Sequence, residues 1–207
     1  MQRILNPRKS KVAVLVVDMN ELKPLAEGMQ RTATPAKENH RREIAIGNIC
    51  RVTNRAAELG IPVIFTNMNN EIVLGLNERI VATTKGSFTE FPKMYFDSFR
   101  ETGLDESLKE AGIKTLVECG FHRAFCLKET TKKGLELGYR IITSNSLIIG
   151  WAARSHQYFD LYSCSYRLDN TQKDFLLGSL GAMAYYGRKT DFCYSTSHAI
   201  KKMERAA

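Results

Sequence analysis

The feature that constrains the fold most is the unbroken apolar run VAVLVV at residues 12–17. A strand with one face in solvent alternates apolar and polar side chains, whereas this run is apolar at every position and rich in valine. The run therefore predicts a central strand of a parallel sheet, covered by helices on both faces. It ends at Asp18, which places a carboxylate at the carboxyl end of the strand.

Helix-like and strand-like segments alternate along the rest of the chain. Apolar residues recur at helical spacing within residues 41–59, Gly60 ends this helix, and the next strand is expected at Val63–Thr66. Further helices are expected at Ile72–Ile80, Leu104–Ala111, Cys126–Leu137, 170–186 and from Thr196 or Ser197 onward. Further strands are expected within Phe88–Met94 and at Ile113–Cys119, Tyr139–Thr143 and Asp191–Ser195.

This order of elements predicts an α/β protein, a three-layer α/β/α sandwich around a mostly parallel, Rossmann-like six-stranded sheet. The strand within Phe88–Met94 carries Pro92, which has no backbone N–H to donate, so we expect this strand to be an edge or irregular one. No repeat, low-complexity tract or linker interrupts the pattern, and a single domain over residues 1–207 is the simplest organisation.

Charge and composition narrow the classes of partner. The net charge is +8, but the basic residues are scattered and form no long run, so nucleic acid is not an expected partner. No apolar stretch approaches the length of a membrane-spanning helix, and the first residues are polar and basic rather than a secretory leader. Five widely spaced cysteines are typical of a reduced protein, and we expect a soluble, cytoplasmic one.

The segment TLVECGFHRAFCLKETTKKGLELGYRII, residues 115–142, carries the clearest chemical signal. A strand runs into a turn at Gly120, and Cys126 stands where the next helix should begin. A thiol at a helix start meets unpaired N–H groups and the positive end of the helix dipole, which favour the thiolate. An isolated cysteine at such a position is more often a small buried apolar residue, so its neighbours decide the interpretation.

Two charged residues follow other strands of the expected sheet. Asp18 follows the first strand and Lys93 the third, and Cys126 lies beyond the fourth. Because the carboxyl ends of parallel strands meet at one edge of a sheet, we expect the carboxylate, the ammonium and the thiol to lie together. Asp18 could accept the thiol proton as a general base, and Lys93 could hold both groups ionised. Lys85 is the alternative candidate for the lysine of this set.

Four segments in order resemble the motifs of one family. They are VLVVDM, RAAELGIPVIFT, KMYFDSFRETGLDESLKEAGI and CGFHRAFCL. Together they are similar to the isochorismatase-like cysteine hydrolases, which include nicotinamidases and carbamoylsarcosine amidase, and the resemblance covers roughly residues 11–145. The resemblance implies that Cys126 is the nucleophile, Asp18 the base and Lys93 the third member of a catalytic triad.

The resemblance also implies a cis peptide bond between Phe121 and His122. The backbone N–H groups of His122 and Cys126 would then form an oxyanion hole. His122, Arg123 and Phe125 replace the small residues that the family usually has between the glycine and the cysteine. His122 is expected to act as a pocket wall or through its backbone, while a catalytic role of its ring stays open.

The residues at the positions where relatives bind a metal or the substrate also differ from the family pattern. The loop NMNNEIVLG, residues 67–75, offers one carboxylate and no imidazole, unlike the metal loop of nicotinamidases, so we expect no metal and no cofactor. Asn20 stands where the family often has glutamine. Asn20, Asn67 and Trp151 are candidates for contacting the substrate.

The function that the resemblance implies is hydrolysis of an amide or ureido C–N bond in a small molecule, through a thioester on Cys126. One alternative is vinyl-ether hydrolysis of the isochorismate type, whose enzymes share the fold but lack the cysteine. Another is a catalytically idle family member that acts as a binding or scaffold protein. Residues 67–88 and 146–170 carry apolar side chains that a monomer would expose, so we expect a homodimer or higher homo-oligomer with residues 146–170 at or near the interface.

Overall fold

The computed structural model describes residues 10–22, 36–68, 73–123, 125–149, 190–193 and 195–207. The helix expected at 170–186, the substrate candidate Trp151 and most of the expected interface segment lie outside the described residues.

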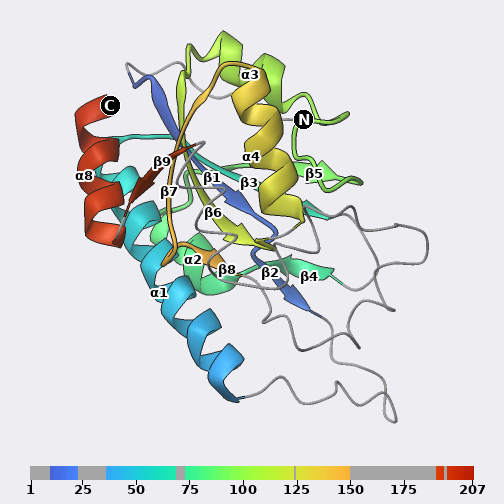
Figure 1. The fold of residues 1–207 in the computed structure, drawn as a ribbon, viewed down its shortest axis with the longest axis vertical. Coiled ribbons are helices and arrows are strands. Elements are labelled where there is room, and N and C mark those ends of the chain that lie inside the picture. Colours follow the sequence, from blue (N-terminus) through green and yellow to red (C-terminus); the bar gives the residue numbers. More distant parts are fainter. Residues whose placement is uncertain (1–9, 23–35, 69–72, 124, 150–189, 194) are drawn as a thin grey trace.

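The centre of the molecule is a parallel sheet in the order β5-β3-β1-β6-β7-β9, with β8 beside β6 (Figure 1). Its strands are β1 (Val12–Val17), β3 (Val63–Met68), β5 (Thr89–Lys93), β6 (Thr115–Phe121), β7 (Arg140–Ser144), β8 (Ile148–Ile149) and β9 (Asp191–Cys193). The six expected strands are all present, the valine-rich run lies inside the sheet, and the strand with Pro92 lies at its edge. The short β8 is a seventh strand that the sequence did not indicate. The α/β fold class is confirmed.

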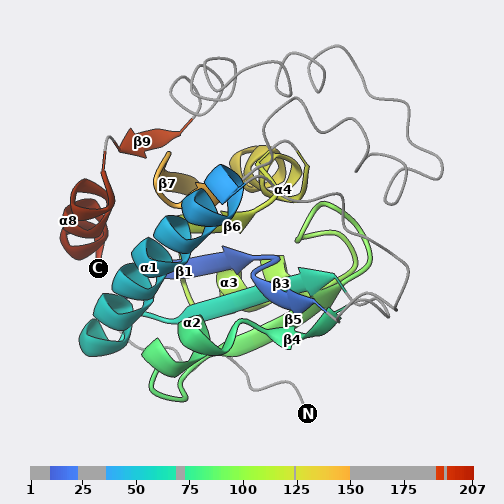
Figure 2. The same cartoon turned by 90° about the horizontal axis from the view of Figure 1, so that it is seen from below.

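Helices cover both faces of this sheet (Figures 1 and 2). They are α1 (Ala36–Leu59), α2 (Glu78–Thr83), α3 (Leu104–Glu110), α4 (Cys126–Glu136) and α8 (Thr196–Ala206). All six side chains of β1 are fully buried. The even-numbered residues of β1, from Val12 to Val16, pack with α1 and α8 on one face. The odd-numbered residues, from Ala13 to Val17, pack with α3 and α4 on the other. Burial on both faces is the reason that β1 is apolar at every position.

The segment after β3 differs from the helix expected at Ile72–Ile80. Val73–Leu76 forms β4, which pairs antiparallel with β2 (Asn20–Leu22) in a small second sheet. The helix α2 begins only after Asn77, whose side-chain oxygen accepts a hydrogen bond from the amide of Ile80 at 3.3 Å. Gly75, with a φ of 154°, disfavours a helix, and an asparagine cap sets the later start.

The residue that caps the last helix also differs from the one expected from the sequence. The side chain of Ser195, rather than Thr196 or Ser197, caps α8 by accepting a hydrogen bond from the amide of His198 at 3.2 Å. Within the described ranges, no helix combines the length and the apolar character needed to cross a membrane.

Candidate active site

The carboxylate of Asp18 is fixed at the end of β1 by neighbouring strands. Its backbone N–H donates to the carbonyl oxygen of Thr66 at 2.8 Å, and its own φ is 49°. One side-chain oxygen, Oδ1, accepts the amide of Met68 at 2.9 Å, and the other, Oδ2, accepts Lys93 Nζ at 2.8 Å. Both oxygens are thus held in place, in a side chain that is 7% exposed.

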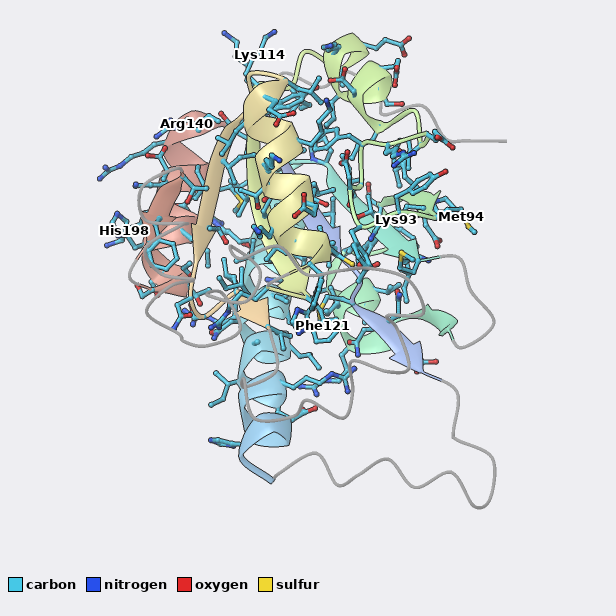
Figure 3. The ribbon with its side chains drawn as sticks, turned by 45° about the vertical axis from the view of Figure 1, so that its right-hand side comes forward. Lys93, Met94, Lys114, Phe121, Arg140 and His198 are labelled. Carbon is cyan, nitrogen blue, oxygen red and sulfur yellow. The ribbon has the colours of Figure 1, made fainter. Side chains whose placement is uncertain are left out.

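Lys93 is the last residue of β5, and its ammonium group lies inside the protein (Figure 3). Nζ donates to Asp18 and also to the carbonyl oxygen of Tyr95 at 3.2 Å. A buried ammonium is tolerated only with such partners, because removing the charge from water is costly. The alternative candidate, Lys85, is exposed in the turn after α2. The lysine that contacts Asp18 is therefore Lys93.

Cys126 is the first residue of α4 and is almost completely buried. Burial raises the pKa of its thiol above the usual value, and the negative charge of Asp18 raises it further, whereas Lys93 acts in the opposite direction. A hydrogen bond between the thiol and Asp18 also raises the thiol pKa, and one with Lys93 lowers it. The expectation that the helix start favours the thiolate is therefore wrong for the resting site, because burial and the nearby carboxylate outweigh it. The thiol is therefore protonated at rest, with the Asp18 carboxylate close enough to act on its pKa.

The turn between β6 and α4 contains the expected backbone feature. The peptide bond between Phe121 and His122 is cis. The carbonyl oxygen of His122 accepts hydrogen bonds from the amides of Phe125 and Leu127, at 3.0 and 3.2 Å. Among the described residues, the amide of Cys126 donates to no backbone carbonyl. The first N–H groups of a helix have no partner within it, so the amide of Cys126 suits an acceptor oxygen.

The ring of His122 is buried against two aromatic side chains. Its centroid lies 4.8 Å from that of Phe121 and 4.9 Å from that of Phe125. Burial, followed by the positive charge of Arg123, lowers the pKa of His122 to about 3. The imidazole is therefore neutral at physiological pH, in keeping with a role as a wall of the site.

The two asparagine candidates lie at strand ends beside Asp18. Asn20 and Asn67 are each 7% exposed, and the side-chain oxygen Oδ1 of each is buried without a hydrogen-bond partner in the described structure. Buried amide oxygens are usually paired, so both positions suit a donor from a bound molecule or an ordered water. The described residues contain no group of three or more His, Cys, Asp or Glu side chains that could hold a metal.

Sequence reasoning missed the partners that orient the charged pair, the amide of Met68 and the carbonyl of Tyr95. Both are backbone groups and have no residue-type signature. It also missed Glu118, which is fully buried in β6 and accepts a hydrogen bond from Thr131 of α4 at 2.5 Å. A glutamate within an otherwise apolar strand was the available signal for this residue.

Comparisons with known proteins agree with this architecture. The sequence model of the isochorismatase domain matches residues 12–158, more than two thirds of the chain. No curated protein sequence gives a significant match. A cysteine hydrolase from Pseudomonas syringae pv. phaseolicola is similar in structure, with a TM-score of 0.69 at 15% identity over 100% of this chain and 98% of that one.

Two further solved structures carry different activities on a similar fold. An N-carbamoylsarcosine amidase from Thermoplasma acidophilum has a TM-score of 0.58 at 20% identity, over 88% of this chain and 95% of that one. The MAR1 ribonuclease from Caenorhabditis elegans has a TM-score of 0.63 at 16% identity, over 97% of this chain and 90% of that one. Likeness at this identity establishes the fold alone, whereas the domain match establishes the family. The chain belongs to the isochorismatase-like hydrolase family.

Proposed function

We propose that this protein is a cysteine hydrolase that cleaves an amide or ureido C–N bond in a small molecule, with Cys126 as nucleophile, Asp18 as base and Lys93 as third member of the triad. The observation that carries the proposal is the buried ion pair between Lys93 Nζ and Asp18 Oδ2, 2.8 Å apart, beside a buried thiol on which both charges act. A base, a cation and a nucleophile at one sheet edge are the parts that acyl transfer needs.

In the first half of the reaction, the Cys126 thiol transfers its proton to the Asp18 carboxylate as the sulfur attacks the substrate carbonyl carbon. The carbonyl electrons move to oxygen, and the N–H groups of His122 and Cys126 stabilise the resulting oxyanion. When the carbonyl re-forms, the C–N bond breaks and the proton on Asp18 passes to the leaving nitrogen. A thioester remains on Cys126, and ammonia or an amine departs.

In the second half, a water molecule gives a proton to Asp18 and attacks the thioester carbonyl. The C–S bond breaks, the sulfur recovers the proton, and the carboxylic acid leaves. Lys93 keeps Asp18 charged between the two proton transfers and balances the negative charge as the sulfur ionises. The raised pKa of Cys126 fits this scheme, because a protonated resting thiol requires the base that the site supplies.

Three other functions predict different behaviour. Vinyl-ether hydrolysis would leave the Cys126 thiol without a role. A scaffold protein would have no use for a buried charged pair, which well-packed apolar residues can often replace without loss of stability. RNA cleavage, as the name of the Caenorhabditis elegans neighbour suggests, would show steeply salt-dependent binding of oligonucleotides.

A substrate panel with matched variants tests the proposal. Primary amides and N-carbamoyl compounds are incubated with wild type, Cys126→Ser and Cys50→Ser, and released ammonia is measured. Cys50 lies half-buried on α1, so its variant controls for loss of a thiol outside the site. We expect Cys50→Ser to keep the wild-type rate and Cys126→Ser to lose it. Equal rates in wild type and Cys126→Ser, or cleavage of an RNA oligonucleotide with no amide turned over, would exclude the proposed reaction.

A further inference from the structure

Three buried hydroxyl groups meet beneath the site, each from a different element. Thr66 lies in β3, Ser98 in the segment after β5, and Thr130 in the second turn of α4; none is more than 1% exposed. The Thr66 and Ser98 hydroxyl oxygens are 2.8 Å apart. Thr130 Oγ1 donates to Ser98 Oγ at 2.9 Å and accepts the Ser98 amide at 3.1 Å. We call these three residues the hydroxyl junction.

Each member of the junction is tied to one member of the proposed triad. The carbonyl of Thr66 accepts the amide of Asp18, and the amide of Met68, two residues on, donates to the Asp18 carboxylate. Ser98 belongs to the segment whose Tyr95 carbonyl accepts Lys93 Nζ.

Thr130 lies four residues after Cys126, one helical turn along α4. The junction therefore joins the three segments that carry base, cation and nucleophile.

Ser98 is fixed at every polar atom. Its carbonyl accepts the hydroxyl of Thr102 at 2.7 Å, its amide donates to Thr130, and its hydroxyl contacts both threonines. Packing brings the same segment against α4 at a second place, because a Cβ built on Gly134 would lie 3.4 Å from the Phe99 ring. The segment after Lys93 is thus held by hydrogen bonds and by packing against α4, the helix that begins at Cys126.

The Lys93–Asp18 ion pair fixes β5 relative to β1, while α4 is held against β6 by packing and by the hydrogen bond from Thr131 to Glu118. The junction adds a direct link between α4 and the lysine segment, because Thr130 bonds to both the amide and the hydroxyl of Ser98. Losing one partner would leave buried polar groups unpaired, which costs stability. Such a junction holds one geometry rather than several.

We propose that Thr66, Ser98 and Thr130 are positioning residues that set the distance between the Cys126 sulfur and the Asp18–Lys93 pair. This inference rests on the proposed function for its meaning in catalysis, although its geometric part can be measured without a substrate. Because residue 130 acts through its hydroxyl, Thr130→Ser should preserve the geometry of the site, whereas Thr130→Val should not. Small displacements of reacting groups have large effects on rate, up to about 10²-fold for about 1 Å.

The test follows the pH dependence of Cys126 alkylation by iodoacetamide, with the modified peptide identified by mass spectrometry. Thr130→Val lets α4 move away from both Asp18 and Lys93 and admits water. The opposed effects of the two charges then weaken together, and burial, the largest cause of the raised thiol pKa, is reduced. We expect the alkylation midpoint to shift to lower pH by more than about half a unit. Thr130→Ser should keep the wild-type midpoint.

Thr53→Val is the matched control, because Thr53 is a fully buried threonine that bonds to Ile49 and Thr83. It belongs to α1, which packs on the face of the sheet opposite α4. Thr53→Val should lower stability without moving the midpoint. If Thr130→Val does not fold, Ser98→Ala serves in its place, with a shift in the same direction. A midpoint in the folded Thr130 or Ser98 variant equal to that of wild type would overturn the inference.

A kinetic measurement separates this inference from the proposed function. With any amide that wild type turns over, Thr130→Val should lower kcat per folded molecule at least about 10-fold and change KM much less. If Cys126→Ser still hydrolyses that amide, the proposed function fails, and the alkylation profile still decides whether the junction positions the sulfur.

Discussion

The Asp18 carboxylate has both oxygens engaged within the protein, one by the Met68 amide and the other by the Lys93 ammonium. Each carboxylate oxygen has a second lone pair, so the group can still accept a proton while its orientation is kept. The buried pair makes the two residues dependent on one another. Removing one charge leaves the other buried without a partner, whereas removing both leaves no buried charge.

Single and double variants of this pair test that dependence. We expect Asp18→Asn and Lys93→Met each to lower kcat at least about 10²-fold, the usual scale for a lost acid–base group. Lys93→Met should also destabilise the fold by about 3–5 kcal/mol, because Asp18 is then buried without its cation. The double variant, measured by urea unfolding, should be more stable than Lys93→Met alone. Additive losses in the double variant would show that the two charges do not depend on each other.

At the scale of elements, the site depends on how closely β6 passes β1. Gly120 pairs with Val17 in the register of these strands and has a φ of 128°. A Cβ built at this position would lie 2.0 Å from the Val17 carbonyl oxygen, far inside the contact distance of a non-bonded carbon and oxygen. A side chain at Gly120 would push β6 away from β1, and with it the turn that leads to Cys126.

Two glycine substitutions give a matched test of this contact. Gly120→Ala should destabilise the protein by several kcal/mol or prevent folding, because the clash is with backbone. Gly47→Ala, within α1, meets nothing within 4 Å and should stabilise the protein by about 0.5–1 kcal/mol. Thermal unfolding of the two variants beside wild type measures both effects. A Gly120→Ala protein as stable as wild type would contradict the close approach of the strands.

These elements also show where the sequence is informative. The valine run predicted a strand buried on both faces, and the strand ends predicted that Asp18 and Lys93 would meet, since both follow from the geometry of parallel sheets. The strand β4 was missed because Val73–Leu76 has apolar residues that suit either a strand or a helix, and its partner β2 is distant in sequence. The direction of the Cys126 pKa was missed because it depends on burial and on Asp18, neither of which local sequence reveals.

At the scale of the whole molecule, Glu118 makes stability depend on pH. It lies in the centre of the sheet beneath α4, with Oε1 buried and unpaired, and burial raises its pKa to about 8 despite the hydrogen bond from Thr131. The folded protein therefore holds this proton up to about pH 8, whereas the unfolded chain releases it near 4.5. The contribution to stability is complete below pH 4.5 and is lost as the pH rises from there to about 8.

Urea unfolding of wild type and Glu118→Gln between pH 4 and 9 checks this assignment. The uncharged amide removes the titration, so the variant should be more stable than wild type at pH 9, by an amount on the order of a few kcal/mol. The difference should shrink as the pH falls toward 4. A difference that is constant across the range would show that Glu118 does not titrate in this window.

Assembly remains a prediction at the same scale. Met94, labelled in Figure 3, follows Lys93 at the sheet edge. Its side chain is 65% exposed, and that of Ile44 in α1 is 50% exposed. Together with the apolar segment 146–170, most of which lies outside the described residues, these side chains suit a contact between identical chains. We expect light scattering at micromolar concentration to give about twice the chain mass or a higher multiple. A single monomeric species would contradict this expectation.

In the proposed reaction, Cys126 carries the acyl group of the substrate during turnover. The most direct measurement mixes wild type with an amide it hydrolyses, stops the reaction with acid within milliseconds to seconds, and determines the intact and peptide masses. We expect an added mass equal to that of the acyl group on the peptide that contains Cys126. It should be absent from Cys126→Ser and should decay as substrate is consumed. Steady hydrolysis with no adduct at any time, and an undiminished rate in Cys126→Ala, would contradict the proposed reaction.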